Sequence, residues 1–256
     1  MQVGVIGCSG RTGSRIVTCL EQNSKYKVGP GFSRKSSFSL SHIVQSNDVL
    51  VDFSTPHVTE ELIDQLQYFP KPVIIGTSAF PGNFDRRREK LQTLVCKVPV
   101  VLCPNVSMGA YVQKRLVTLL AQLCNECYDI RITETHHRNK QDRISGTAQD
   151  LVTTVCRTKL DCWGQEYSLG SFGKTGRKIE LHSSRVGDVP GEHEVAFVSN
   201  GEQIIVRHTV FSREVFALGV LHILDWLFTV NPEPSLYGFE DALKVALWDE
   251  HCLLKK

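Results

Sequence analysis

The chain opens with the stretch Gln2-Val-Gly-Val-Ile6-Gly7-Cys-Ser-Gly10-Arg-Thr-Gly13, which decides the fold of its first part. Residues 2–6 form an apolar run typical of a buried strand, and the glycines allow a tight turn into a helix expected from about Thr12 to Asn23. Such a turn presents backbone N–H groups and a helix N-terminus to a pyrophosphate. The spacing G-x-x-G-x-x-G departs from the usual G-x-G-x-x-G, so a purely structural turn stays open as an alternative.

Strand and helix patterns alternate from this turn to about residue 102. The runs are almost continuously apolar, as in a parallel sheet covered on both faces. Pro56 stands where a helix is expected to begin. The further expected strands are Tyr26–Phe32, Asp48–Phe53, Pro72–Gly76 and Val98–Leu102. The pattern predicts a doubly wound α/β domain.

The pattern changes after residue 106. Helices are expected over residues 107–124 and 145–159, the second capped by Ser145. Strands are expected over residues 128–135, 178–185, 194–198 and 203–211. Asn200-Gly201 predicts a hairpin between the last two strands. The sequence thus predicts an α+β domain with a mostly antiparallel sheet over residues 107–212, and a helix over Ser212–Val230 that returns to the first domain, so that residues 1–106 and 213–256 form one dinucleotide-binding domain.

Composition narrows the class of protein. A formal net charge of +2 over 256 residues gives no reason to expect a nucleic-acid partner. The first strand begins near residue 1 and no apolar run approaches the length of a membrane span, so neither a leader peptide nor a membrane partner is expected. Nine irregularly spaced cysteines indicate a reducing, cytoplasmic compartment rather than a disulfide framework.

The segment Glu134-Thr-His-His-Arg-Asn-Lys140-Gln-Asp-Arg-Ile-Ser145-Gly-Thr147 carries the most chemical information. It lies between an expected strand and an expected helix, and it holds two histidines, two arginines and a lysine. The helix N-terminus behind these cations is a ready site for an anion. The segment therefore combines groups that bind carboxylates with groups able to donate a proton. A solvated basic loop is the plain alternative, and a metal site is disfavoured because Lys and Arg repel a cation.

The second expected strand ends at Ser33-Arg34-Lys35. An acidic residue at this point would bind the ribose 2′-hydroxyl of NADH, whereas two cations suit the 2′-phosphate of NADPH. The sequence therefore favours NADPH over NADH. Use of both cofactors, or a merely solvated basic loop, stays open.

The motif E-x-H-H-x-x-K-x-D-x-x-S-G-T resembles the signature of the dihydrodipicolinate reductase family. Further matches follow in the family's order along nearly the whole chain: Gly7 to Gly13, Asp52 to Ser54, Gly76 to Ser78, Pro104 to Gly109, Arg185 to His193 and Ser212-Arg213. The resemblance implies a Rossmann-like domain plus a substrate-binding and oligomerisation domain. It also implies hydride transfer from NAD(P)H to a cyclic unsaturated dicarboxylate imine, which gives tetrahydrodipicolinate for diaminopimelate and lysine synthesis, in a homotetramer.

Residue roles follow from the resemblance by position. His136 and Lys140 would be catalytic in proton transfer. The residues that would bind the substrate are His137, Lys140, Ser145, Gly146, Thr147 and Ser78. The residues that would bind the cofactor are Gly7, Cys8, Ser9, Gly10, Arg11, Thr12, Gly13, Arg34, Lys35, Phe53, Ser54, Gly76, Thr77, Ser78, Pro104, Asn105, Val106, Arg213 and Phe216. No metal site is expected.

Two departures from the family pattern concern substrate contacts. Ser78-Ala79 stands where Thr-Gly is common, and Arg143-Ile144 stands where Ala-Pro is common. Two other functions stay open: another NAD(P)-dependent dehydrogenase acting on a dicarboxylate or an aldehyde, and a dinucleotide-sensing protein without turnover.

Overall fold

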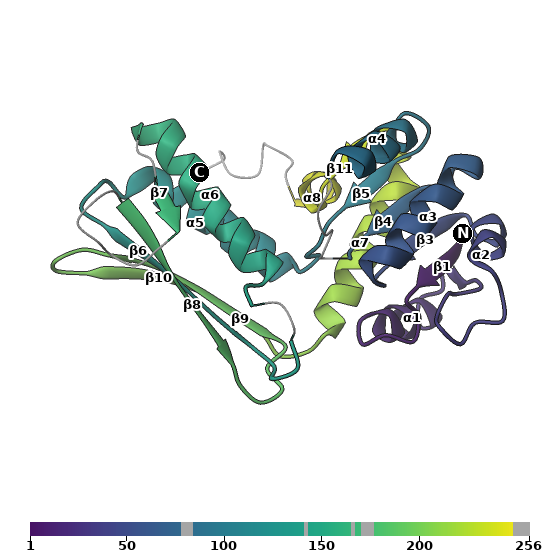
Figure 1. Ribbon diagram of the computed structural model, residues 1–256, viewed down its shortest axis with the longest axis horizontal. Coiled ribbons are helices and arrows are strands. Elements are labelled where there is room, and N and C mark those ends of the chain that lie inside the picture. Colours follow the sequence, from purple (N-terminus) through teal and green to yellow (C-terminus); the bar gives the residue numbers. More distant parts are fainter. Residues whose placement is uncertain (78–83, 141–142, 165–166, 170–176, 248–256) are drawn as a thin grey trace. The chain divides into compact units, whose positions relative to one another are not determined.

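The computed structural model describes residues 1–77, 84–140, 143–164, 167–169 and 177–247. The chain forms two compact units (Figure 1). One consists of Met1–Ser107 with Arg213–Lys256, and the other of Met108–Ser212. The backbone therefore passes between the units twice, before Met108 and after Ser212.

The first unit is built on a six-stranded sheet in the order β11-β5-β4-β3-β1-β2. Every pairing in it is parallel. Its strands are β1 (Gln2–Ile6), β2 (Lys27–Val28), β3 (Val49–Asp52), β4 (Val73–Ile75), β5 (Val100–Leu102) and β11 (Leu236–Tyr237). The four central strands are almost wholly buried, as their apolar sequences predict.

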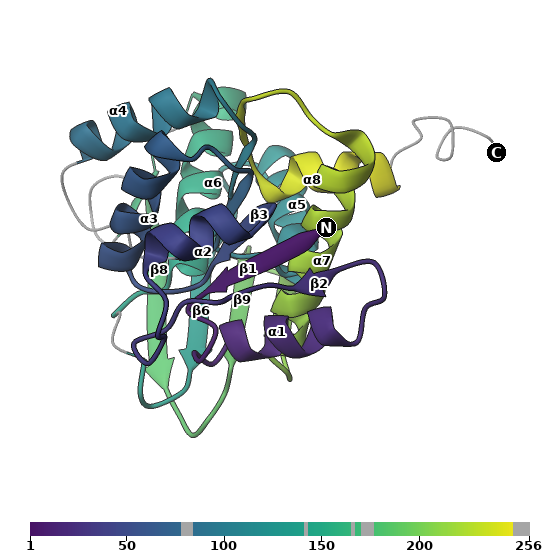
Figure 2. The ribbon, with the colours of Figure 1, turned by 90° about the vertical axis from the view of Figure 1, so that its right-hand side faces the viewer.

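Two sets of helices cover this sheet on opposite faces (Figure 2). The first set is α1 (Gly13–Glu21), α7 (Glu214–Val230) and α8 (Phe239–Leu247). The second set is α2 (Leu40–Ser46), α3 (Pro56–Tyr68) and α4 (Phe84–Val95). The predicted doubly wound class is confirmed, and α7 does pack on α1 in the first unit.

The second unit is a five-stranded sheet in the order β10-β9-β6-β8-β7. Its strands are β6 (Asp129–His136), β7 (Tyr167–Leu169), β8 (Arg177–Arg185), β9 (Gly191–Val198) and β10 (Gln203–Val210). Helices α5 (Met108–Leu123) and α6 (Gly146–Trp163) pack together over it. The sequence predicts a mostly antiparallel sheet, whereas the sheet is mixed: β9 runs antiparallel to β6 and β10, but β8 runs parallel to β6 and β7.

The second strand of the first sheet is much shorter than expected. The strand expected over Tyr26–Phe32 pairs regularly only at Lys27–Val28, and Phe32 forms a separate bridge to Ile6. The N–H groups of Lys27 and Gly29 donate to Met1 and Val3, and the next N–H to donate to β1 is that of Phe32 rather than that of Gly31, so one extra residue interrupts the ladder. Among the described residues, no helix has the length and apolar character needed to cross a membrane.

Candidate active site

The register of the first sheet brings four strand ends to one edge. Ile6 pairs with Asp52, Asp52 with Ile75, and Ile75 with Leu102. Since these strands are parallel, the loops that follow them leave the sheet side by side. Ligands of open α/β sheets bind at this carboxyl edge. The predicted cofactor residues of the glycine turn, of residues 53–54, of residues 76–77 and of residues 104–106 therefore lie together.

The glycine turn is compact because its backbone approaches itself closely. Gly7 has a φ of +85°, a conformation that favours glycine. The N–H of Gly10 donates to the carbonyl of Gly7 over 2.8 Å. A Cβ on Gly13, the first residue of α1, would lie 2.1 Å from that carbonyl oxygen. The three glycines thus let α1 begin directly against the end of β1.

The side chains of Asp52 and Phe53 contact the loops that follow β3 and β4. A Cβ on Gly76 would lie 2.2 Å from Phe53 Cζ, so the phenyl ring lies directly against the Gly76 backbone. The Asp52 carboxylate is fully buried and accepts hydrogen bonds from the hydroxyls of Ser54, Thr59 and Thr77. Burial raises the pKa of Asp52, against the opposing effect of these hydrogen bonds. Ser78, predicted to contact both ligands, lies outside the described residues.

Arg34 and Lys35 follow the bridge that Phe32 makes to Ile6. Both side chains are exposed, in a turn that the Ser36 hydroxyl closes by donating to the carbonyl of Gly31 over 3.0 Å. The same bridge places this turn beside the glycine turn, because the N–H groups of Gly7 and Cys8 both donate to the Phe32 carbonyl. The two cations are thus presented next to the predicted pyrophosphate site.

The last two residues predicted to bind the cofactor, Arg213 and Phe216, lie at the start of α7. Arg213 precedes the helix, and the N–H of Phe216 donates to its carbonyl over 3.1 Å. A Cβ on Gly219 would lie 1.8 Å from the carbonyl oxygen of Val106. The first turns of α7 therefore pack against the loop that follows β5, where Pro104, Asn105 and Val106 lie.

The second unit gathers the histidine-rich residues. His136 ends β6 and is 6% exposed, and His137 is 7% exposed. The loop after them is anchored on the loop after β8, since Val186 N–H donates to the His136 carbonyl over 2.8 Å. Lys140 is half-buried. The predicted proton donors and the start of α6 thus lie within this unit.

Ser145 caps α6 as predicted. Its hydroxyl accepts from the N–H of Ala148 over 3.1 Å and lies 3.0 Å from Nε2 of His193. Gly146 and Thr147 occupy the first turn, which contains no acidic residue. The positive end of the helix dipole thus meets no acidic side chain of its own first turn, and the Ser145 N–H beside it donates to the Glu134 carboxylate.

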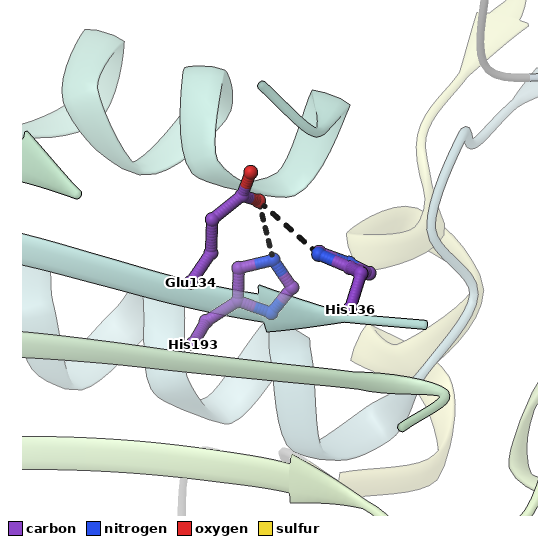
Figure 3. A group of neighbouring side chains, drawn as sticks. All are labelled: Glu134, His136 and His193. Carbon is purple, nitrogen blue, oxygen red and sulfur yellow. Dashed lines mark ion pairs between the residues drawn. The ribbon is translucent and has the colours of Figure 1, made fainter. Parts of the chain in front are cut away.

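Glu134 lies at the centre of this unit's polar groups and is fully buried (Figure 3). Its Oε2 is 3.5 Å from His136 Nδ1 and 3.6 Å from His193 Nε2. Burial opposes its ionisation, but the groups that donate to it, first among them His193, outweigh burial and hold the pKa of Glu134 well below its usual range. Burial, and then His193, lower the pKa of His136 to about 4.

The role of Glu134 and His193 was not predicted from the sequence. The pattern of β6 contains the signal for Glu134, since Ile130, Ile132, Glu134 and His136 alternate onto one buried face. Glu134 and His136 are ionisable side chains on a buried face, so each needs a polar or charged partner there. His193 comes from β9, whose pairing with β6 no local pattern predicts.

The same three side chains have ligand atoms close enough together to hold a metal ion, within 4.8 Å of one another. The Arg185 guanidinium lies 3.5 Å from the same carboxylate, and Ser145 and Ser183 donate hydrogen bonds to it. A cation would have to displace these donors beside a fixed positive charge. The contacts therefore favour a buried polar cluster over a metal site.

Comparisons with known proteins agree over nearly the whole chain. The family model described as "Dihydrodipicolinate reductase, N-terminus" matches residues 1–106, and that described as "Dihydrodipicolinate reductase, C-terminus" matches residues 109–243. The 4-hydroxy-tetrahydrodipicolinate reductase of Chlamydia caviae is 53% identical over 247 residues, which cover 96% of this chain and 100% of that protein. That of Chlamydia muridarum is 45% identical and covers 97% of each chain.

Solved structures agree on the fold. The chain is similar to a structure described as "Dipicolinate bound Dihydrodipicolinate reductase from Paenisporosarcina sp. TG-14", with a TM-score of 0.71 and 21% identity over 94% of this chain and 98% of that one. The resemblance stated from the sequence is confirmed. This chain belongs to the dihydrodipicolinate reductase family.

Proposed function

We propose that this chain is a cytoplasmic reductase that transfers a hydride from NAD(P)H to the cyclic dicarboxylate imine derived from 4-hydroxy-tetrahydrodipicolinate, giving tetrahydrodipicolinate. The observation that carries the proposal is 53% identity, over nearly the full length, to a protein of that name. No two described cysteines form a disulfide, which is compatible with a reducing compartment.

The first unit supplies the cofactor site of this proposal. The dinucleotide would lie along the carboxyl edge of the sheet, with its pyrophosphate at the glycine turn and its nicotinamide near Gly76 and Thr77. Arg34 and Lys35 support a preference for NADPH, because two exposed cations beside the turn suit a 2′-phosphate. The cofactor supplies the hydride when bound.

The second unit supplies the substrate site. Lys140, His137 and the start of α6 would hold the two carboxylates of the substrate. Hydride addition to the conjugated C=C–C=N system leaves negative charge on the enamine side, and a proton must be delivered there. His136 and Lys140 are the proposed proton donors.

A homotetramer built on the second sheet is also part of the proposal. Its edge strand β10 exposes Ile204 and Ile205, which are 37% and 42% accessible, and within the described part of the chain this strand pairs with β9 alone. Light scattering on the purified protein measures the mass of the assembly, and a monomer would contradict this part.

The function is tested by following NADPH and NADH oxidation with the product of dihydrodipicolinate synthase as substrate. Turnover with this substrate and none with other dicarboxylates or aldehydes is expected. Oxidation of neither cofactor, in a protein that still binds them, would instead identify a dinucleotide-sensing protein.

The proton donors are tested by His136→Ala and Lys140→Ala. Each is expected to lower kcat by about a hundredfold, the scale of general acid catalysis, with the cofactor affinity retained. Cofactor fluorescence titration measures the affinity. An unchanged kcat in both variants would remove their assigned role.

A further inference from the structure

We infer that Glu134 is a positioning residue that fixes the ring of His136 in one tautomer, with Nε2 left to exchange the proton, and that ties this ring to the start of α6. This inference rests on the proposed function for the use of His136. It assigns to Glu134 a role in the reaction without contact with the reacting atoms.

The Glu134 carboxylate is buried and receives donors on both oxygens. Oε1 accepts from the Ser183 hydroxyl over 2.6 Å and lies 3.5 Å from the Arg185 guanidinium. The Ser145 N–H lies 3.2 Å from each oxygen. Oε2 is the atom that faces the two histidine rings (Figure 3). A buried carboxylate with this many donors is held in one orientation.

The tautomer of His136 follows from what its Nδ1 faces. This nitrogen is buried, and among the described residues it has no hydrogen-bond partner, but it lies 3.5 Å from Glu134 Oε2. A lone pair on Nδ1 would repel the carboxylate, whereas an N–H there is attracted to it. The neutral ring therefore carries its proton on Nδ1, and Nε2 is the nitrogen that takes up and gives away a proton.

His193 forms a second arm of the cluster, by which we mean its contacts with Glu134 and Ser145. This arm links His136 to the helix that would bind the substrate carboxylates. His193 Nε2 lies 3.6 Å from Glu134 Oε2 and 3.0 Å from the Ser145 hydroxyl. The backbone of His193 is held in turn by the Gln113 amide, which donates to its carbonyl over 2.6 Å. One carboxylate thus sets both the His136 ring and the first residue before α6.

The charge of Glu134 also sets how readily His136 takes up a proton. The groups that act on the His136 ring are Glu134, His193, Lys140 and Arg185. Only Glu134 among them favours the charged ring, and burial and the other three oppose it. Removal of the carboxylate charge should therefore lower the pKa of His136 further.

The tautomer is tested first in the unmodified protein by ¹⁵N NMR of the histidine side chains. The signals of His136 are assigned among the nine histidines by their loss in His136→Gln. At neutral pH the spectrum should show a protonated Nδ1 and an unprotonated Nε2. A proton on Nε2 of the neutral ring would overturn the inference, whatever the turnover of the protein.

The role in the reaction is tested with Glu134→Gln, which keeps the size of the side chain and removes its charge. The matched control is Glu180→Gln, because Glu180 also precedes a histidine by two residues on a strand and lies 3.4 Å from His182, but is partly exposed. We expect Glu134→Gln to lower kcat at neutral pH at least about tenfold, as loss of an orienting partner does. The control should leave kcat unchanged.

The pH profile separates positioning from a structural effect. In Glu134→Gln the limb of the kcat profile that reports His136 should move to lower pH, and the neutral ring should populate both tautomers.

Should Glu134→Gln fail to fold, His193→Gln removes the second arm and should lower substrate affinity more than kcat. Unchanged kcat, pH profile and tautomer in a folded Glu134→Gln would refute the inference, while absence of turnover in the unmodified protein would refute only the proposed function.

Discussion

His136 shows how surroundings set the chemistry of a single side chain. The ring is 6% exposed and its pKa is lowered to about 4, so it is neutral in the free protein near pH 7. A neutral ring cannot donate a proton from Nε2 until it has gained one. A substrate with two negative charges would favour that protonation, so substrate binding itself would activate the proposed donor.

The lowered pKa of His136 predicts a pH dependence of stability. The unfolded chain binds this proton near pH 6.5 and the folded chain near pH 4. The free energy of unfolding should therefore fall as the pH is lowered from about 6.5 to about 4, by up to about 1.4 kcal/mol per pH unit from this group. Urea unfolding of the protein and of His136→Gln over this range measures the difference. His182→Gln, at an exposed histidine, is the control, and equal slopes in all three proteins would contradict the assignment.

Arg34 carries the prediction about the cofactor. Arg34→Asp should weaken NADPH binding relative to NADH at least about tenfold, because a charge-assisted contact to the 2′-phosphate is lost and a like charge is introduced. Lys27→Asp, at an exposed residue of β2, is the control for the change in net charge. Dissociation constants for both cofactors check the ratio, and an unchanged ratio in Arg34→Asp would reject the contact.

At the scale of elements, two helices approach the backbone so closely that only glycine fits. α1 meets the glycine turn at Gly13, and α7 meets the loop after β5 at Gly219. In both places the atom that a Cβ would strike is a backbone carbonyl oxygen, which cannot move aside as a flexible side chain can. These contacts hold the two helices against the edge where the cofactor is proposed to bind.

Gly13→Ala is therefore expected to destabilise the protein by about 1–3 kcal/mol, the usual cost of overpacking, and to weaken cofactor binding. The control is Gly201→Ala, because a Cβ at Gly201 meets nothing within 4 Å among the described residues. Urea unfolding midpoints and cofactor titration measure both effects. Equal stability of the two variants would show that α1 can shift without consequence.

At the scale of the whole molecule, the two predicted ligand sites belong to different compact units. The first unit holds the predicted dinucleotide residues, and the second holds the histidine-rich loop and the start of α6. Each unit has its own apolar core. Ligand binding should therefore stabilise the units separately when the ligands are added one at a time.

Hydrogen exchange checks this separation. NADPH alone should protect the amides of the glycine turn and of α1, and dipicolinate, the ligand named in the Paenisporosarcina structure, should protect those around His136 and Ser145. A small neutral amide added at the same concentration is the control. Protection of the second unit by NADPH alone would contradict the assignment of the two sites.

The sequence by itself determined the alternation of strands and helices in the first unit, the glycine turn and the Ser145 cap. These follow from local rules: buried strands are apolar runs, only glycine adopts the φ of Gly7 freely, and a serine hydroxyl caps a helix. The resemblance then gave the family, which the comparisons confirm. The individual roles of the site residues stay predictions.

Only the tertiary structure decided which side chains share the buried cluster and how the second sheet is ordered. Glu134 and His136 are two residues apart on β6. His193 lies near them because β9 pairs with one side of β6, and Arg185 lies near them because β8 pairs with the other side of β6. Strand order depends on long-range packing, which local periodicity does not encode. The ionisation of Glu134 and His136 depends on that packing in turn, since burial and neighbouring charges, rather than residue type, set it.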